Sequence, residues 1–96
     1  MDCNLVKKSQ LSDTVTFYAV MGNNALYGTY RTYIFGNFNN ANVSLSSCSY
    51  YNSSGNDYNI TSSTTIAKVN DNCYQVATTD SGARGCYIAV GLSITP

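Results

Sequence analysis

The 96-residue sequence contains no histidine and no glutamate, and its only proline is the last residue. Charged residues make up only 10% of the chain, and five Lys and Arg residues balance five Asp residues. Binding to nucleic acid irrespective of sequence requires clustered Lys and Arg that displace counterions, so this balance argues against it. No apolar run is long enough to suggest a membrane-spanning helix. We therefore expect a single domain, residues 1–96, that does not bind membranes.

Four cysteines are the main candidates for covalent chemistry. Their spacing lacks the CxxC pattern of zinc and redox sites, and no histidine could complete a metal site, so we expect no metal and no cofactor. In so short a chain they are typical of a secreted protein with two disulfides. They are Cys3, Cys48, Cys73 and Cys86. The first residues, MDCNLVKKS, contain no apolar segment, so we expect that a signal peptide was removed and that Met1 was added as a start.

Alternation of apolar and polar residues predicts about five strands. They are expected at 30–36, 42–50, 64–70, 73–79 and 86–94. Two segments rich in turn-forming residues, 69–73 and 79–85, are expected to join the last three strands as a meander. The strands are enough for one antiparallel sheet.

The segment LSDTVTFYAVMGNN, residues 11–24, fits two secondary structures. Its β-branched and aromatic residues from Thr14 to Tyr18 favour a strand. Ser12 or Asp13 could instead cap a helix that Gly22 would end. Five residues would then share one helical face: Leu11, Val15, Tyr18, Ala19 and Gly22. The residues alone leave both structures open.

Several segments resemble a known family. VNDNCYQVATTDSGARGCYIAV, residues 69–90, is similar to the C-terminal strand, loop and strand of the small fungal extracellular guanyl-specific ribonucleases. LYGTYRTYIFGNFNN, residues 26–40, resembles their first sheet strand, and SDTV at 12–15 resembles the start of their helix. A closer resemblance is to the ribonuclease-like secreted effectors of powdery mildew fungi, the RALPH-type effectors. It is carried by the strand at 28–36 and by the GxxxC ending at 82–86.

The sequence departs from this family both in its alignment and in the residues that catalysis requires. Tyr30 stands where proline is common, and residues 41–63 align poorly. The enzymes use a glutamate, two histidines and an arginine, whereas this chain has neither glutamate nor histidine. Asp80 would occupy the place of the acid histidine, and at neutral pH an ordinary Asp carries no proton to donate. The resemblance therefore implies a ribonuclease fold without catalytic residues, a pseudoenzyme.

The resemblance also implies a fold and a disulfide pairing. The fold would be α+β, with one N-terminal helix at about 12–22 packed on a twisted antiparallel sheet of about five strands. A Cys3–Cys86 bond would join the two ends of the chain, leaving Cys48–Cys73 as the second pair. A Cys73–Cys86 bond across the last hairpin stays open as a rival.

In place of an active site, the resemblance implies a partner surface at the former nucleotide cleft. It would consist of Tyr27, Tyr30, Arg31, Tyr33, Asp80, Ser81 and Arg84. Tyrosine and arginine can stack on bases, but the neutral charge gives phosphate little attraction, so we expect RNA binding to be weak at most. The simpler interpretation is that half of these tyrosines pack over the sheet.

The implied function is that of a monomeric virulence effector, secreted and translocated into the cytoplasm of a plant host cell. It would bind a host plant protein, and an intracellular NLR immune receptor could recognise it as an avirulence protein. Two alternatives stay open. One is an RNA-binding pseudoenzyme. The other is an unrelated small secreted β protein, such as a killer toxin or a carbohydrate-binding adhesin, which would lack the helix at 12–22.

Overall fold

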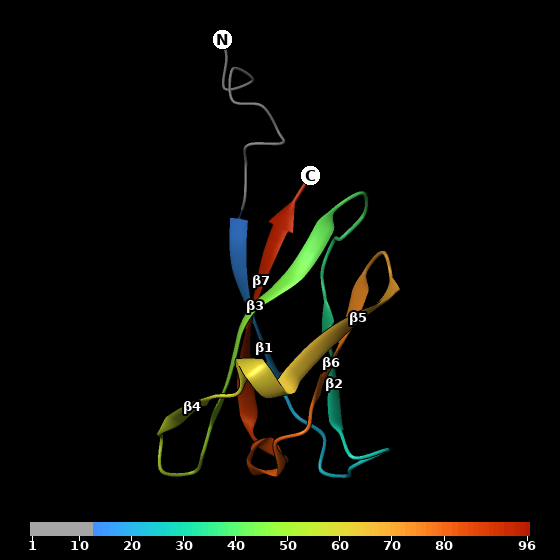
Figure 1. The fold of residues 1–96 in the computed structure, drawn as a ribbon. Helices are drawn as coiled ribbons and strands as arrows, with labels where there is room; N and C mark the ends of the chain where they lie inside the picture. The colour runs from blue at the N-terminus through green and yellow to red at the C-terminus, as the bar shows by residue number, and fades with distance from the viewer. Residues whose placement is uncertain (1–12) are drawn as a thin grey trace.

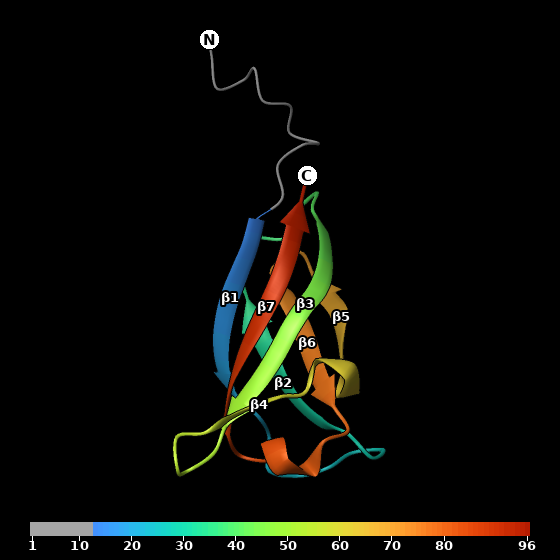
Figure 2. The same ribbon diagram turned by 60° about the vertical axis from the view of Figure 1, so that its left-hand side comes forward.

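Residues 13–96, described by a computed structural model, form two antiparallel β-sheets that pack face to face (Figure 1). The four-stranded sheet contains, in spatial order, β1 (Asp13–Val20), β7 (Tyr87–Thr95), β3 (Asn42–Tyr51) and β4 (Asp57–Asn59). The three-stranded sheet contains β2 (Tyr30–Phe35), β6 (Cys73–Thr78) and β5 (Thr64–Asn70). Two short 3-10 helices, η3 (Thr61–Ser63) and η4 (Ser81–Ala83), lie between strands. Figure 2 shows the four-stranded sheet in front of the other.

The core lies between the sheets and is built mainly from alternate residues of the longer strands. From β7, the side chains of Ile88, Val90 and Leu92 point inward and are fully buried. Ile34 of β2 and Val76 of β6 meet them from the three-stranded sheet. Because successive side chains of a strand point to opposite faces, the residues between these face away from the core. Within residues 13–96, no helix has the length and apolar character needed to cross a membrane.

The helix expected at about 12–22 is wrong, and with it the α+β fold class, because Asp13–Val20 form strand β1. All eight of its residues pair with β7, from Asp13 opposite Ile94 to Val20 opposite Tyr87. As a strand, β1 turns Phe17 and Ala19 toward the core and Tyr18 toward solvent. Backbone pairing with β7 thus determines the secondary structure of a segment whose own residues fit either a helix or a strand.

Each of the five segments expected to be strands contains one, but they belong to two sheets rather than one. β5 and β6 form the expected hairpin. β6 and β7 do not pair, so the expected meander of the last three strands is wrong. The turn residues at 79–86 instead carry the chain from the three-stranded sheet to the four-stranded sheet. The three-residue strand β4 was not predicted.

The expected disulfides are also wrong for the described residues, where Cys48, Cys73 and Cys86 are all free thiols. Cys48 of β3 points into the core between the sheets. Cys73 pairs with Phe35 and, by the alternation along β6, points to the outer side of the three-stranded sheet. The two thiols therefore face different layers and cannot meet. Cys3, the expected partner of Cys86, lies outside the described residues.

Phe38 should contribute strongly to stability, because its fully buried ring packs against rings from both sheets. Its centroid lies 4.8 Å from that of Tyr74 and 5.8 Å from that of Phe17. We expect Phe38→Ala to lower the free energy of unfolding by about 3–5 kcal/mol, measured by urea denaturation. Phe35→Ala is the matched control, since this ring is 72% exposed and should change stability by only about 0.5 kcal/mol. Equal losses in the two variants would contradict the described core.

The thiols should differ in reactivity toward iodoacetamide in the folded protein. Burial raises the pKa of the Cys48 thiol, although a hydrogen bond with Thr64 partly opposes the shift. Because the thiolate is the reactive form, alkylation of Cys48 should be slow near pH 8 and rise only at higher pH. Cys86 is only partly buried and should react before Cys48 and Cys73, the two buried thiols of the described residues.

Peptide mass mapping after timed labelling resolves each cysteine separately. Labelling in urea serves as the control, because unfolding should remove the difference between Cys48 and Cys86. Equal labelling rates in the folded protein, or a linked Cys48–Cys73 peptide in an unreduced digest, would contradict the structure.

Candidate functional site

The carboxylates with described contacts serve local turns. Asp71 forms an ion pair with Lys68, with 3.0 Å between the carboxylate oxygen and Nζ. Asp80 accepts a hydrogen bond of 2.8 Å from the backbone N–H of Gly82. Within residues 13–96, no group of three or more His, Cys, Asp or Glu side chains could hold a metal ion.

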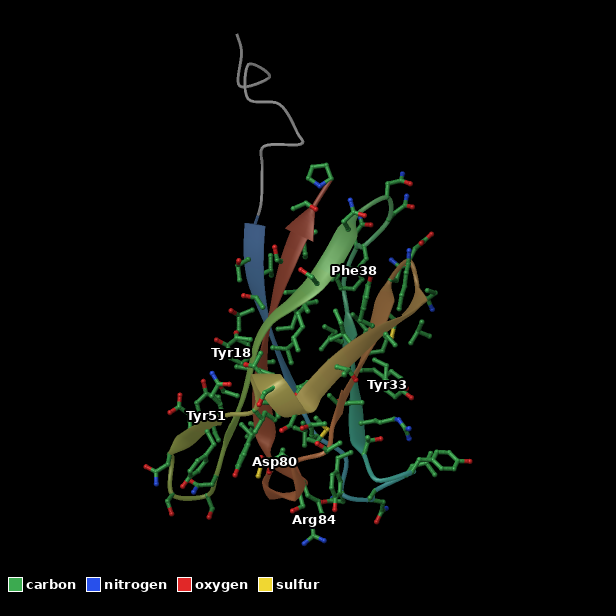
Figure 3. All side chains as sticks on the ribbon, in the orientation of Figure 1. Tyr18, Tyr33, Phe38, Tyr51, Asp80 and Arg84 are labelled. Carbon is green, nitrogen blue, oxygen red and sulfur yellow. The ribbon has the colours of Figure 1, made fainter. Side chains whose placement is uncertain are left out.

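The structure spreads the expected partner surface over several places. Tyr30 is partly buried and packs against the core. Arg31 and Tyr33 follow it on β2, and Tyr33 is exposed on the outer face of the three-stranded sheet, where its hydroxyl donates to Gln75 Oε1 at 3.4 Å. Figure 3 shows Tyr33 on the opposite side of the molecule from Tyr18. Arg31 and Tyr33 therefore share the outer face of the three-stranded sheet, whereas Tyr30 faces the core and does not.

Asp80, Ser81 and Arg84 lie in the turn that crosses between the sheets, at the lower end of the molecule in Figure 3. The Asp80 side chain caps this turn through Gly82, and the Arg84 N–H donates to the Ser81 carbonyl at 3.2 Å. The Gly85 N–H in turn donates to the Gly22 carbonyl at 3.3 Å, which ties the turn to the end of β1. The role of Asp80 that the contacts show is therefore structural.

Tyr50 of β3 lies above the same turn, and its hydroxyl covers Gly82 so closely that a side chain there would collide with it. Its ring stacks on that of Tyr58, with 5.1 Å between centroids. Desolvation, and then the negative charge of Asp80, raise the pKa of Tyr50 above its usual value. The Tyr50 phenol therefore remains neutral at pH values where an ordinary tyrosine begins to ionise.

Tyr27 occupies the tip of a tight hairpin and is 90% exposed. Leu26 and Thr29 exchange two backbone hydrogen bonds, of 2.8 and 3.2 Å, around two residues with positive φ: 53° at Tyr27 and 79° at Gly28. This is the backbone of a type I′ turn, in which the first position favours Asn, Asp or Gly. A bulky residue there is strained, and the exposed ring gains nothing from burial. The turn itself thus gives no reason for a tyrosine.

A contiguous set of exposed aromatic and apolar residues lies on the outer face of the four-stranded sheet. Tyr87 of β7 is 70% exposed and pairs with Val20 of β1 on one side and with Tyr51 of β3 on the other. Tyr18, two residues before Val20 on β1, is 74% exposed on the same face. We call Tyr18, Val20, Tyr51 and Tyr87 the tyrosine face. Figure 3 shows Tyr18 and Tyr51 projecting from this side.

Small neutral residues adjoin the tyrosine face. The register places Tyr18 in one row with Ala89, Ser49 and Asn59 across the sheet. The next row along the strands consists of Thr16, Gly91 and Ser47. Asp57 pairs with Tyr51 at the edge of the sheet and is the one charged side chain among these paired outward positions. The outer face is therefore aromatic toward its lower end and hydroxyl-rich above it.

The tyrosine face was missed in the sequence, because two of its members were assigned to other roles. Tyr18 was assigned to one face of the helix that the resemblance implied, and Tyr87 to a strand in a meander of the last three strands. The alternation in 13–20 and 87–95 is the signal that could have shown which residues point outward. The register that brings Val20, Tyr87 and Tyr51 together cannot be seen in any one of the strands.

Comparison of the chain with protein-family models, curated proteins and solved structures finds no match.

The strain at Tyr27 predicts that its replacement stabilises the protein. Asn tolerates positive φ and is the preferred partner of Gly in a type I′ turn, so Tyr27→Asn should raise the free energy of unfolding by about 1 kcal/mol. Asn40, with a φ of 56°, is the other described non-glycine residue with a positive φ, and it provides a matched control. Asn40→Tyr should lower stability by a similar amount in the same urea titration. A loss of stability in Tyr27→Asn would show that the ring contributes to the fold.

Proposed function

We propose that this chain is a non-catalytic binding module that recognises its partner through the tyrosine face. The observation that carries the proposal is the row of Val20, Tyr87 and Tyr51, which are exposed although they lie side by side on three paired strands. Single exposed apolar residues are ordinary on protein surfaces, whereas contiguous ones mark interaction sites. Tyrosine suits this role because its rigid ring offers a large contact area at a low cost in conformational entropy.

Two further features support a binding role. The surroundings of the tyrosine face are rich in Ser, Asn and Gly, and these residues accompany tyrosine in the binding loops of antibodies, where they supply adaptable hydrogen bonds. Tyr27 is an exposed aromatic residue outside the tyrosine face, held in a strained turn that its own residue type does not favour. Strain of this kind persists where function requires a residue that folding does not.

The proposal keeps the expectation that the chain acts by binding rather than by catalysis. Its expected secretion, its delivery into a plant host cell and its recognition by an immune receptor stay predictions. Secretion was inferred from the cysteines, whose expected disulfides are absent among the described residues. Delivery into a host cell and recognition by a receptor came with the resemblance to a ribonuclease fold, and β1 stands where that fold has its helix. The proposed binding surface is therefore argued from the sheet alone. The RNA-binding alternative is less favoured, since Arg31 and Tyr33 lie away from the tyrosine face.

A pair of matched double variants tests the proposal. Tyr18→Thr with Tyr87→Thr removes two rings from the tyrosine face, while Tyr33→Thr with Phe35→Thr removes two exposed rings from the other sheet. Threonine keeps the β propensity of all four positions, so both variants should fold. Each is screened with the parent chain against a displayed random-peptide library, an array of neutral and acidic oligosaccharides, and single-stranded RNA.

We expect at least one probe class to bind the parent chain and the control variant, and to bind the tyrosine-face variant about tenfold more weakly or worse. The proposal fails if no probe binds the parent chain, or if binding survives in the tyrosine-face variant. It also fails if turnover of any bound RNA or oligosaccharide is detected, since the module would then be an enzyme.

A further inference from the structure

We infer that the ligand of the tyrosine face is a neutral glycan, bound along an internal stretch of its chain. This inference rests on the proposed function and gives its partner a chemical class. Three properties of the outer face of the four-stranded sheet support it. They are its charge, the chemistry of its paired rows, and the extent across the sheet of the row that contains Val20, Tyr87 and Tyr51.

The charge of the face excludes polyanions as favoured ligands. The described basic side chains are Arg31, Lys68 and Arg84, which belong to β2, β5 and the turn after η4. None of them belongs to β1, β7, β3 or β4. A phosphate or sulfate polymer needs Lys or Arg beneath it, so RNA, heparin-like chains and anionic lipids gain little from this surface. The only charge among its paired outward positions is the carboxylate of Asp57, which can accept hydrogen bonds from neutral hydroxyl groups.

The paired rows offer the two kinds of group that a sugar ring requires. A pyranose has apolar C–H patches on its faces and hydroxyl groups around its rim. Tyrosine supplies an apolar ring for the first and a hydroxyl for the second. The row of Tyr18 also carries Ser49 and Asn59, whose side chains both donate and accept hydrogen bonds. Rows two residues apart along a strand are separated by about 7 Å, so neighbouring sugars can reach both.

A protein partner fits the same face less well. Protein interfaces commonly use complementary charges to fix orientation and to exclude wrong partners. Here the paired outward positions offer Asp57 as their one charge. A glycan without charge matches a surface almost without charge, and it can be oriented by hydroxyl groups alone.

The row reaches both edge strands of the four-stranded sheet, which favours the interior of a polymer over a terminal sugar. Val20 lies on β1 and Asp57 on β4, and these are the two edge strands of the sheet. Tyr87 and Tyr51 lie between them on adjacent strands, spaced by about 4.8 Å. A ligand laid across the row can therefore continue past either edge of the sheet.

Titration followed by ¹H–¹⁵N NMR tests the inference on the full chain. The probes are soluble cello-, chito-, manno- and xylo-oligosaccharides, with an acidic oligogalacturonate as the charged comparison. We expect at least one neutral series to shift the amide signals of Tyr18, Ser49 and Tyr87. Affinity should increase with oligosaccharide length, because longer chains cover more of the row. It should also be unchanged between about 50 and 500 mM salt, since no counterions are released.

Three variants locate the binding site. Tyr87→Thr should weaken binding about tenfold or more, because it removes the ring at the centre of the row. Tyr33→Thr, on the other sheet, should leave affinity unchanged. Asp57→Asn should keep most of the affinity, because the amide oxygen still accepts a hydrogen bond from a sugar hydroxyl.

The inference is overturned if no neutral oligosaccharide shifts these signals at millimolar concentration. It is also overturned if only the acidic comparison binds, with an affinity that falls with salt, or if Tyr87→Thr binds as the parent chain does. Failure of the glycan inference is distinguishable from failure of the proposed function. A displayed peptide that loses binding in the Tyr18 and Tyr87 double variant would leave the binding module in place and change only the class of its partner.

Discussion

Pairing of β7 on both of its sides is the interaction on which the rest of the structure depends. One edge of this strand pairs with eight residues of β1 and the other with nine residues of β3. The inward side chains Ile88, Val90 and Leu92 then close over the three-stranded sheet. Once this register is set, the outward positions of three neighbouring strands are fixed as well. The same strand pairing therefore fixes both the core, on the inner side of the sheet, and the tyrosine face, on its outer side.

Sequence reasoning succeeded where one property of a segment determines its structure. Alternation along 42–51 and 87–95 marks strands irrespective of their partners, and turn residues at 69–73 mark the β5–β6 hairpin. Sequence reasoning failed where the secondary structure of a segment depends on pairing with a strand that is distant in the sequence. Residues 13–20 fit a helix or a strand, and they form a strand because all eight pair with β7. The resemblance to ribonucleases then favoured the wrong structure, because similarity in short segments of strand and loop carried no information about which strands pair.

The same limit explains the errors in cysteine pairing and in strand order. Four cysteines in a short chain suggest disulfides, yet alternation places Cys48 inside the sandwich and Cys73 on the outside of one sheet. The turn formers at 79–85 predict a reversal of the chain, but they do not say which sheet the next strand joins. For the candidate site, Tyr27 was included because the resemblance placed it in the former nucleotide cleft, and the structure shows it exposed for a different reason, at the tip of a tight turn. Tyr87 was not included, because its neighbours are contributed by β1 and β3.

Alternation along β7 has a consequence for how such a protein can change over generations. Tyr87 and Ile88 are adjacent in the chain, yet one is exposed and the other is wholly enclosed. Substitution of Tyr87 changes the outer surface of the sheet, whereas substitution of Ile88 changes the packing of the core. Selection for a new partner can therefore act on Tyr18, Tyr51 and Tyr87 without disturbing the residues that hold the sheets together. The fold separates heritable variation in recognition from the requirement to remain folded.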